Sequence, residues 1–356
     1  PYERTTERQG YANGYKPKRI DTPAGTVTVD VPKTAGHDGA PFYPQSLERG
    51  RRSVRAVMLA VAEMYIKGVS TRDVEAVMRE FGIESLSSSQ VSRAAKLLDD
   101  ELEAWRTRPL GEIRYLILDA RYEKMRHGGI VRDAAVLSAI GIGPDERRRV
   151  LGVSVALSEA EVHWRAFLES LQARGLRGVK LVIADDHKGL RAAARRVFNA
   201  THQRCRVHWM RNALAHAPAK QRTAVAAMLK TIFAQESKAD AEDQWDTVAD
   251  ALREKIEKLG TFMDASRDDV LAYMDFPREH WAQIASTNPL ERVNREIKRR
   301  ADVIGIFPND GAIIRLVGAL MLETNDEWTV ARRYMSLETI ARVTDNATVR
   351  LPAVAT

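Results

Sequence analysis

Apolar residues recur at helical spacing in the segment that follows residue 52. Val57 and Val61 fall on one face of a helix that Gly68 ends, because positions three or four apart share a helical face. A second helix is expected to begin at Ser70, a residue type that caps helix starts, and to end at Gly82. The pattern therefore predicts a compact helical region.

A third helix is expected to begin near Ser87. Val91 and Leu98 lie on its apolar face, while Arg93 and Lys96 point to the other side. Such an order of short helices followed by an exposed polar face is typical of a helix-turn-helix unit, whose last helix enters the major groove of DNA. We therefore expect Arg93 and Lys96 to contact DNA. The alternative is a small helical bundle that docks another protein or dimerises.

The segment before these helices is different in kind. Residues 1–48 are rich in Gly, Pro, Thr and Arg, and only Gly25–Val31 alternates apolar and polar positions. This stretch predicts one short exposed strand between Pro23 and Pro32. The whole segment is expected to be an extended basic arm.

Strands and helices alternate from Ile113 onward. The patterns of hydrophobic and turn-forming residues predict strands over 113–118, 131–142, 149–157, 179–184 and 203–207 and helices over 161–173 and 189–198. The first three strands follow one another as a meander, and the rest have the order of an α/β fold. Between Trp209 and Leu259 only helical periodicity is found, so a helical insertion is expected there.

Charge adds a class of partner to this picture. Lysine and arginine total 55 against 48 aspartate and glutamate residues, a formal net charge of +7, and basic blocks lie at 201–222 and 292–300. An excess of positive charge in blocks favours a polyanionic partner such as nucleic acid. The alternative is that each block is an ordinary solvated surface.

Cysteine content and hydropathy indicate the compartment. Cys205 is the only cysteine and cannot form a disulfide within the chain, so the reducing cytosol is expected. Arg55 and Glu63 interrupt the apolar run at 54–66, which leaves neither a secretion signal nor a membrane span of about 20 residues. We expect a soluble cytoplasmic protein with no membrane partner.

Two carboxylates follow buried strands. Asp119 and Asp185 each stand at the predicted carboxyl end of an apolar strand, where open α/β sheets bind ligands. Two such charges on neighbouring strands repel each other unless a divalent cation lies between them. The alternative is an aspartate that starts a turn or caps the next helix. Asp186 leaves open which of two consecutive aspartates joins Asp119.

Glu291 is the third candidate carboxylate. Asn288, Pro289 and Glu291 could form a capping box at a helix start. The competing interpretation is a helix face that carries Glu291, Asn294 or Arg295, and Lys298, which joins a metal-binding carboxylate to bases able to hold a DNA phosphate.

These residues lie in segments that resemble one known family. YLILDARYEKMR (115–126), DDHKGL (185–190), QRCRVH (203–208) and STNPLERVNREIK (286–298) resemble the mutator-type transposases of bacterial insertion sequences, in order over most of the chain. The resemblance implies a DDE transposase with a ribonuclease-H-like core that an all-helical insertion interrupts. It implies the catalytic triad Asp119, Asp185 and Glu291, holding two Mg²⁺ or Mn²⁺ ions.

The pair Cys205 and His208 is part of that resemblance. With His202 it has the spacing of zinc ligands, but a structural zinc site needs four ligands and the chain has no second cysteine. We expect Cys205 to be a buried apolar residue. His208 either contacts DNA or lies beside the metal ligands as a proton-handling group, a role that the resemblance implies.

The expected organisation is therefore α/β, with a ribonuclease-H-like core that follows a helix-turn-helix-like region. Its parts are an arm (1–52), a helical DNA-binding domain (53–109), the first part of the core (110–212), the insertion (213–284), the final part of the core (285–330) and a tail (331–356). The basic residues expected to contact DNA are Arg93, Lys96, Arg121, Lys124, Lys188, Arg292, Arg295, Lys298 and Arg299.

The function implied is binding of terminal inverted repeats, DNA cleavage and strand transfer, through a copy-out, paste-in route with a circular intermediate. The partners implied are transposon-end and target DNA in the nucleoid and a second copy of the chain in a homodimer. Two alternatives remain open at this point. One is a non-catalytic sequence-specific DNA-binding protein, and the other is a ribonuclease-H-like nuclease or resolvase without strand transfer.

Overall fold

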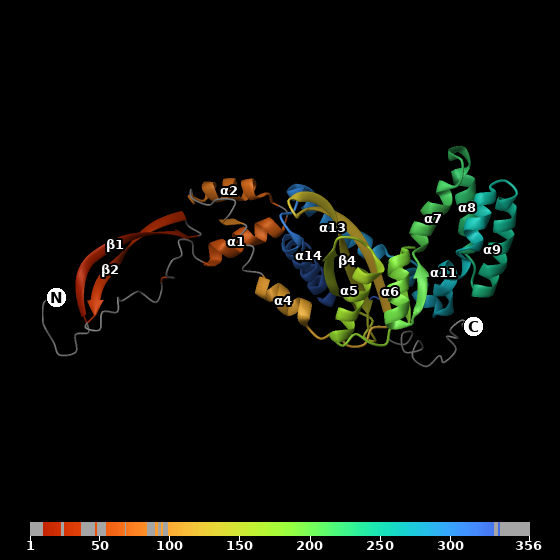
Figure 1. Cartoon of the computed structure of the whole chain (residues 1–356), viewed down its shortest axis with the longest axis horizontal. Coiled ribbons are helices and arrows are strands. Elements are labelled where there is room, and N and C mark those ends of the chain that lie inside the picture. The colour runs from red at the N-terminus through yellow and green to blue at the C-terminus, as the bar shows by residue number, and fades with distance from the viewer. Residues whose placement is uncertain are drawn as a thin grey trace. The chain divides into compact units, whose positions relative to one another are not determined.

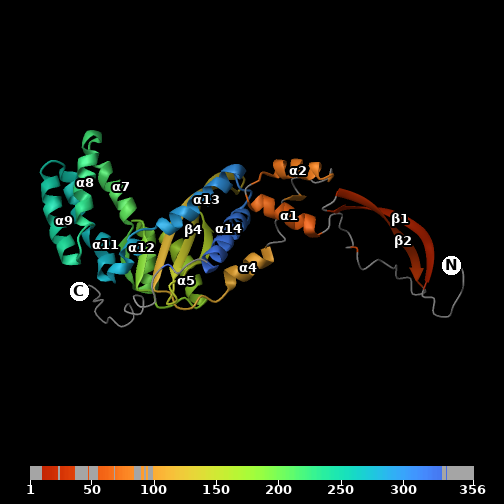
Figure 2. The same cartoon turned by 180° about the vertical axis from the view of Figure 1, so that it is seen from behind.

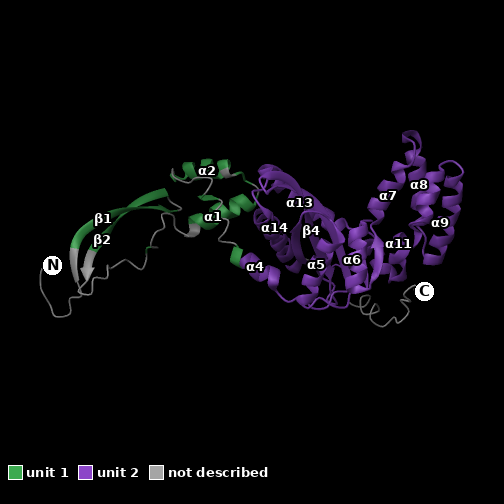
Figure 3. Cartoon of the chain, viewed as in Figure 1, with its two compact units in different colours: residues 1–100 green, residues 101–356 purple. Residues whose placement is uncertain are grey.

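The chain forms two compact units, residues 1–100 and 101–356, which are coloured separately in Figure 3. The computed structural model, drawn in Figure 1, describes residues 10–22, 25–36, 47, 55–67, 69–83, 90–91, 94, 99–330 and 334. The C-terminal tail predicted at 331–356 lies, apart from Tyr334, outside the described residues.

The first unit opens with a two-stranded antiparallel hairpin. Strands β1 (Gly10–Thr22) and β2 (Gly25–Gly36) pair from Thr22 opposite Gly25 outward. The prediction of a single short strand was wrong, because β1 has no clear alternation of its own and β2 continues through Pro32. Both strands are edges, so the missing N–H of Pro32 can face solvent without removing a hydrogen bond from the ladder.

Two helices of the first unit follow the predicted pattern. They are α1 (Arg55–Ile66) and α2 (Thr71–Glu80), and Val61 and Val74 are fully buried in their common core. Ser70 caps α2 by accepting from the Asp73 N–H at 3.1 Å, as expected. Of the predicted third helix, residues 90, 91 and 94 are described and are helical; Arg93 and Lys96 lie outside the described residues.

A five-stranded mixed sheet forms the centre of the second unit. Its strands are β3 (Tyr115–His127), β4 (Ile130–Ile142), β5 (Arg148–Ala156), β6 (Leu181–Ala184) and β7 (Thr201–Arg204). Their order is β5-β4-β3-β6-β7, in which β3, β4 and β5 are antiparallel neighbours and β3, β6 and β7 are parallel. The predicted meander and the predicted α/β order are both confirmed.

Two strand boundaries differ from the prediction. β3 continues for eight residues past Asp119, because the whole strand pairs with β4 as far as His127 opposite Ile130. Asp119 therefore lies within a strand and not at its end. β7 ends at Arg204, and the residues predicted to complete it begin helix α7.

Helices cover both faces of the sheet. The face of Leu116 and Leu118 packs against α5 (Glu161–Ala173) and α6 (Lys188–Phe198). The opposite face, with Tyr115 and Ile117, packs with α4 (Asp99–Thr107), α13 (Asn288–Ile304) and α14 (Asp310–Val330). Figures 1 and 2 view the sheet from these two sides. Since successive side chains of a strand point to opposite faces, odd-numbered residues of β3 face α13.

Between β7 and α13 the described chain is helical throughout, as predicted. Its elements are α7 (Arg206–Ala215), η2 (Ala219–Gln221), α8 (Arg222–Ile232), α9 (Lys238–Arg253), α10 (Glu257–Asp264), α11 (Arg267–Leu271), η3 (Ala272–Asp275), η4 (Arg278–His280) and α12 (Trp281–Ile284). Trp209 and Trp245 are fully buried in its core, with ring centroids 5.0 Å apart.

Helix α4 lies in the range predicted to belong to the DNA-binding domain. Its buried residues Leu102 and Trp105 are nevertheless part of the core beneath the sheet of the second unit. Among the described helices, none combines the length and the apolarity that crossing a membrane requires.

Candidate metal-dependent active site

The register of two parallel strands brings the first two carboxylates together. Ile117 of β3 lies opposite Ile183 of β6. Asp119 and Asp185 each come two residues later, so their side chains project at the same level from the face of the sheet that α13 covers. The pairing that the sequence predicted for these aspartates thus follows from strand register, although Asp119 does not end its strand.

The register also separates Asp185 from its neighbour. Asp186 points to the α6 side, where its carboxylate binds Arg191 at 3.0 Å and Arg204 at 2.9 Å. Two arginines therefore neutralise Asp186. Asp185 is the aspartate that lies with Asp119.

Helix α13 brings Glu291 and Asn294 to the same face. The capping box, the alternative interpretation of Glu291, is not formed: Asn288 is already helical, and Thr287, which precedes it, caps no N–H with its side chain. The Thr287 hydroxyl instead donates to Cys205 Sγ at 3.3 Å. The Glu291 side chain is therefore free to reach toward the sheet.

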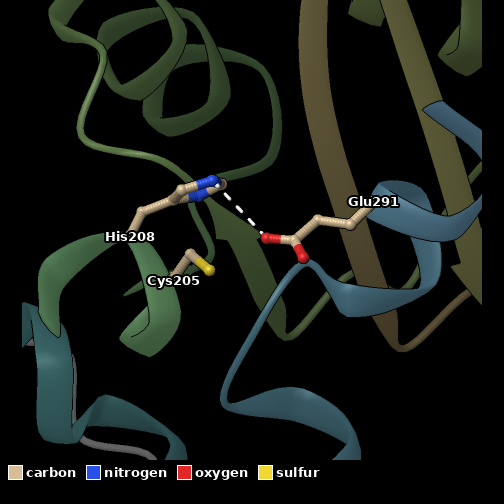
Figure 4. A group of neighbouring side chains, drawn as sticks. All are labelled: Cys205, His208 and Glu291. Atoms are coloured by element: carbon tan, nitrogen blue, oxygen red, sulfur yellow. Dashed lines mark ion pairs between the residues drawn. The ribbon is translucent and has the colours of Figure 1, made fainter. Parts of the chain in front are cut away.

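His208 of α7 lies between the carboxylates of the sheet and of α13. Its Nε2 is 3.5 Å from Glu291 Oε1, and its Nδ1 is 3.9 Å from Asp185 Oδ2. Figure 4 shows the imidazole directed at the Glu291 carboxylate, with Cys205 beside it. Three elements that are distant in sequence thus meet at one place.

The surroundings of the site raise the pKa values of Asp119 and His208. Burial raises the pKa of Asp119 to about 6, opposed by the hydrogen bond from the Ala120 N–H and aided by the charge of Asp185. The hydrogen bond with Cys205 raises the pKa of His208 to about 9 against the effect of burial, and the charges of Asp185 and Asp119 contribute. An imidazolium between carboxylates is the expected consequence at neutral pH.

Donor atoms of Cys205, His208 and Glu291 all lie within 4.8 Å of one another. Burial would raise the pKa of Cys205, but hydrogen bonds with His208 and Thr287 outweigh it and lower that pKa. Cys205 is fully buried, and its sulfur already accepts from both the N–H and the hydroxyl of Thr287. These contacts support a structural role for Cys205, which joins α7 to the start of α13.

Most of the basic residues expected to contact DNA are exposed. They are Lys124, Lys188, Arg292, Arg295, Lys298 and Arg299, of which Arg299 also forms an ion pair with Glu296 at 3.1 Å. Arg121 is different: its side chain is 16% exposed, pairs with Glu123 at 2.5 Å and donates to the Asn294 carbonyl. Its position links β3 to α13.

Two features of the site were not identified from the sequence. One is the hydrogen bond from Asn294 Nδ2 to Asp119 Oδ2, at 2.7 Å. The other is the pair of arginines on Asp186. The alternation of side chains along β6 would have predicted that Asp186 faces α6, since Asp185 and Ile183 share a face.

These observations define the class: an α/β protein whose parallel strands and one covering helix gather carboxylates on a single face of the sheet. Comparison with known proteins adds the family. The profile described as "Transposase, Mutator family" matches residues 1–331. The chain belongs to this family, as the resemblance of its motifs predicted.

Named relatives agree with this assignment. The transposase for insertion sequence element IS406 of Burkholderia multivorans is 48% identical over 94% of this chain and 87% of its own length. The transposase for IS1081 of Mycobacterium tuberculosis is 42% identical over 96% of this chain and 82% of its own. The transposase for IS256 in transposon Tn4001 of Staphylococcus aureus is 36% identical over 95% and 87%.

Proposed function

We propose that this protein is a DDE transposase, which binds the terminal inverted repeats of an insertion sequence, cleaves DNA strands there and joins the ends to target DNA. One observation carries the proposal: Asp119 of β3 and Asp185, which follows β6, project at one level from adjacent parallel strands, and His208 lies between Asp185 and Glu291 of α13. These three carboxylates are the proposed catalytic residues.

The fold supports this chemistry. A three-stranded antiparallel meander followed by two parallel strands, in the order β5-β4-β3-β6-β7, is the arrangement proposed here as a ribonuclease-H-like core. The helices from α7 to α12 interrupt this core before α13. The helices of the first unit are proposed as a helix-turn-helix-like DNA-binding region, with Arg93 and Lys96 on its third helix.

The residues of the site fit divalent metal ions. Carboxylate oxygens are the ligands that Mg²⁺ and Mn²⁺ prefer. Within the described part of the chain, Glu291 Oε1 and Asn294 Oδ1 are buried and have no hydrogen-bond partner. A buried oxygen without a partner costs about 1–3 kcal/mol, which favours a bound cation or its water ligands nearby. When bound, two such ions would supply activation of an attacking water or 3′-hydroxyl and stabilisation of the leaving oxygen.

The chain itself supplies position and charge. Asp119, Asp185 and Glu291 are proposed to hold the ions. Protonated His208, whose ring nitrogens lie 3.9 Å from Asp185 Oδ2 and 3.5 Å from Glu291 Oε1, is proposed to hold these carboxylates together by its charge before metal binds. Exposed bases of α13, with Lys124 and Lys188, are proposed to hold DNA phosphates, since phosphate contacts position a protein on DNA.

The route and the assembly belong to the same proposal. The expected route is copy-out, paste-in through a circular intermediate, by a homodimer that pairs two transposon ends in the nucleoid.

A strand-joining assay tests the proposal. The purified chain is incubated with Mg²⁺ or Mn²⁺, a labelled duplex that carries an end of its own element, and a supercoiled target plasmid. We expect cleavage at the end and covalent transfer of the label to the plasmid, and neither with Asp119→Asn or Glu291→Gln. Cleavage without joining would indicate a nuclease or resolvase, and binding without cleavage a repressor-like DNA-binding protein.

A further inference from the structure

Asn294 connects the catalytic helix to the catalytic strand. It lies three residues after Glu291 on α13, so the two side chains share a helical face. Its Nδ2 donates to Asp119 Oδ2 at 2.7 Å across 175 positions of the sequence. This contact is the direct link between the helix that carries Glu291 and the carboxylate of β3.

The backbone of the same residue is held as well. The carbonyl of Asn294 accepts from the Arg121 guanidinium, and Arg121 is in turn fixed by Glu123 at 2.5 Å. Arg121, Glu123 and Asp119 alternate along one face of β3. Helix α13 is therefore tied to β3 at position 294 through both its side chain and its main chain.

The contact also restricts how Asp119 can turn. Oδ1 of Asp119 accepts from the Ala120 N–H at 2.9 Å and Oδ2 from Asn294. Both carboxylate oxygens of Asp119 accept hydrogen bonds. The amide of Asn294 therefore directs its nitrogen toward Asp119 and its oxygen away from it. That oxygen is buried and has no partner among the residues described.

We propose that Asn294 is a positioning residue, which fixes the Asp119 carboxylate in the orientation that binds a divalent metal ion and sets the distance between β3 and Glu291. The inference rests on the proposed function. Groups that orient metal ligands typically contribute about 10- to 100-fold to metal affinity or activity.

Metal binding to the full chain provides the first test. Mn²⁺ is titrated into wild type, Asn294→Ala and Asn294→Asp, and the unbound ion is measured by its electron paramagnetic resonance signal. We expect affinity to fall by about 10-fold or more in Asn294→Ala, the lower end of the range for such groups. Asn294→Asp has the same shape but lacks the donor, so it is expected to bind no better than Asn294→Ala.

Cleavage kinetics provide the second test. The Mg²⁺ concentration for half-maximal cleavage is expected to rise in both variants, while excess metal restores much of the rate and DNA affinity is unchanged. Asn294→Gln, which keeps an amide donor, is expected to recover part of the loss. Glu296→Gln on the same helix is the matched control, because Glu296 pairs with Arg299 away from the site.

Three results would overturn the inference. Wild-type metal dependence in Asn294→Ala means that the amide does not position Asp119. A rate reduced equally at all metal concentrations, with a lower melting temperature, means a structural role only. Tighter Mn²⁺ binding by Asn294→Asp means that residue 294 is itself a ligand. Failure of the proposed function looks different, because Asp119→Asn would then cleave as well as wild type.

Discussion

Carboxylates on the two faces of the central sheet differ in their ion-pair partners. On the α6 side, Asp186 is neutralised by Arg191 and Arg204, both at 3.0 Å or less. On the α13 side, Asp119 and Asp185 have the side-chain amide of Asn294, the backbone N–H groups of Ala120 and Asp186, and the His208 imidazole 3.9 Å from Asp185. Two arginines balance Asp186, whereas among the described residues Asp119 and Asp185 have no arginine partner and only the protonated His208 offsets part of their charge.

The difference shows how a fold can give two consecutive aspartates different roles. Asp186 forms ion pairs within the protein, whereas Asp185 faces the proposed metal site. Buried or half-buried carboxylates normally acquire cationic partners, because an unpaired charge is costly to desolvate. Carboxylates that have no arginine partner remain available to a cation from solution. The predictions below test whether the two faces differ in this way.

The largest expected effect is the contrast between Asp185→Asn and Asp186→Asn. Loss of a metal-binding carboxylate is expected to reduce strand cleavage by about 1,000-fold or more, since the ions supply most of the charge stabilisation. Asp186→Asn is expected to keep cleavage within about 10-fold at a temperature where it is folded. End-cleavage rates of the two variants measure this contrast, and equal losses would remove the distinction between the faces.

Packing on the α6 side is tested by Gly189→Ala. A Cβ at this position would lie 2.6 Å from the Glu159 carbonyl oxygen and 2.8 Å from the Glu161 nitrogen, which are backbone atoms at the start of α5. We expect unfolding free energy to fall by about 1–3 kcal/mol, as for other overpacked sites. Chemical denaturation measures the loss. Metal affinity should stay at the wild-type value, whereas a change would show that this face also shapes the site.

The charge left on the α13 side predicts a pH dependence of stability. The pKa of Asp119 is raised to about 6 from an ordinary value of 3.8, so between these values the folded state holds a proton that the unfolded chain has lost. The stability that protonated Asp119 contributes below pH 3.8 is therefore lost as the pH rises to about 6. Asp119→Asn should be more stable than wild type at pH 7.5 without metal, by about 1–2 kcal/mol. Melting curves from pH 4 to 8 check this; equal pH slopes would contradict it.

The smallest expected effect concerns the exposed bases of α13. Lys298→Ala should weaken DNA binding by about 3- to 10-fold for any sequence and reduce the salt dependence of binding by about one counterion. Fluorescence anisotropy at several salt concentrations measures both quantities. Lys220→Ala, in the helical insertion, is the comparison, and an identical effect there would show only the influence of net charge.

Local patterns of the sequence were sufficient for much of the fold. Helix α5 has the predicted bounds, Ser70 caps α2 as expected, and the meander β3-β4-β5 was predicted from alternation and one turn. Each of these features depends on residues that are close in sequence. Their hydrophobic period and their capping groups are therefore visible without knowledge of the rest of the chain.

Other features depended on partners that are remote in sequence. The length of β3 follows from its full pairing with β4, and β1 exists because β2 offers it a ladder. The capping box at Asn288 was the local alternative for the role of Glu291. It does not form because the helix already begins at Asn288 and Thr287 bonds to Cys205, 82 residues away, while Glu291 lies beside His208.

By itself, the sequence determined most strands and helices of the second unit, the family to which the chain belongs and the three carboxylates worth testing. Tertiary structure decided that α13 covers the face of the sheet that carries Asp119 and Asp185, and that Asn294 binds Asp119. The physical reason is that periodicity is a property of neighbouring residues, whereas the partner of a polar side chain is chosen by strand register and helix packing across the whole second unit.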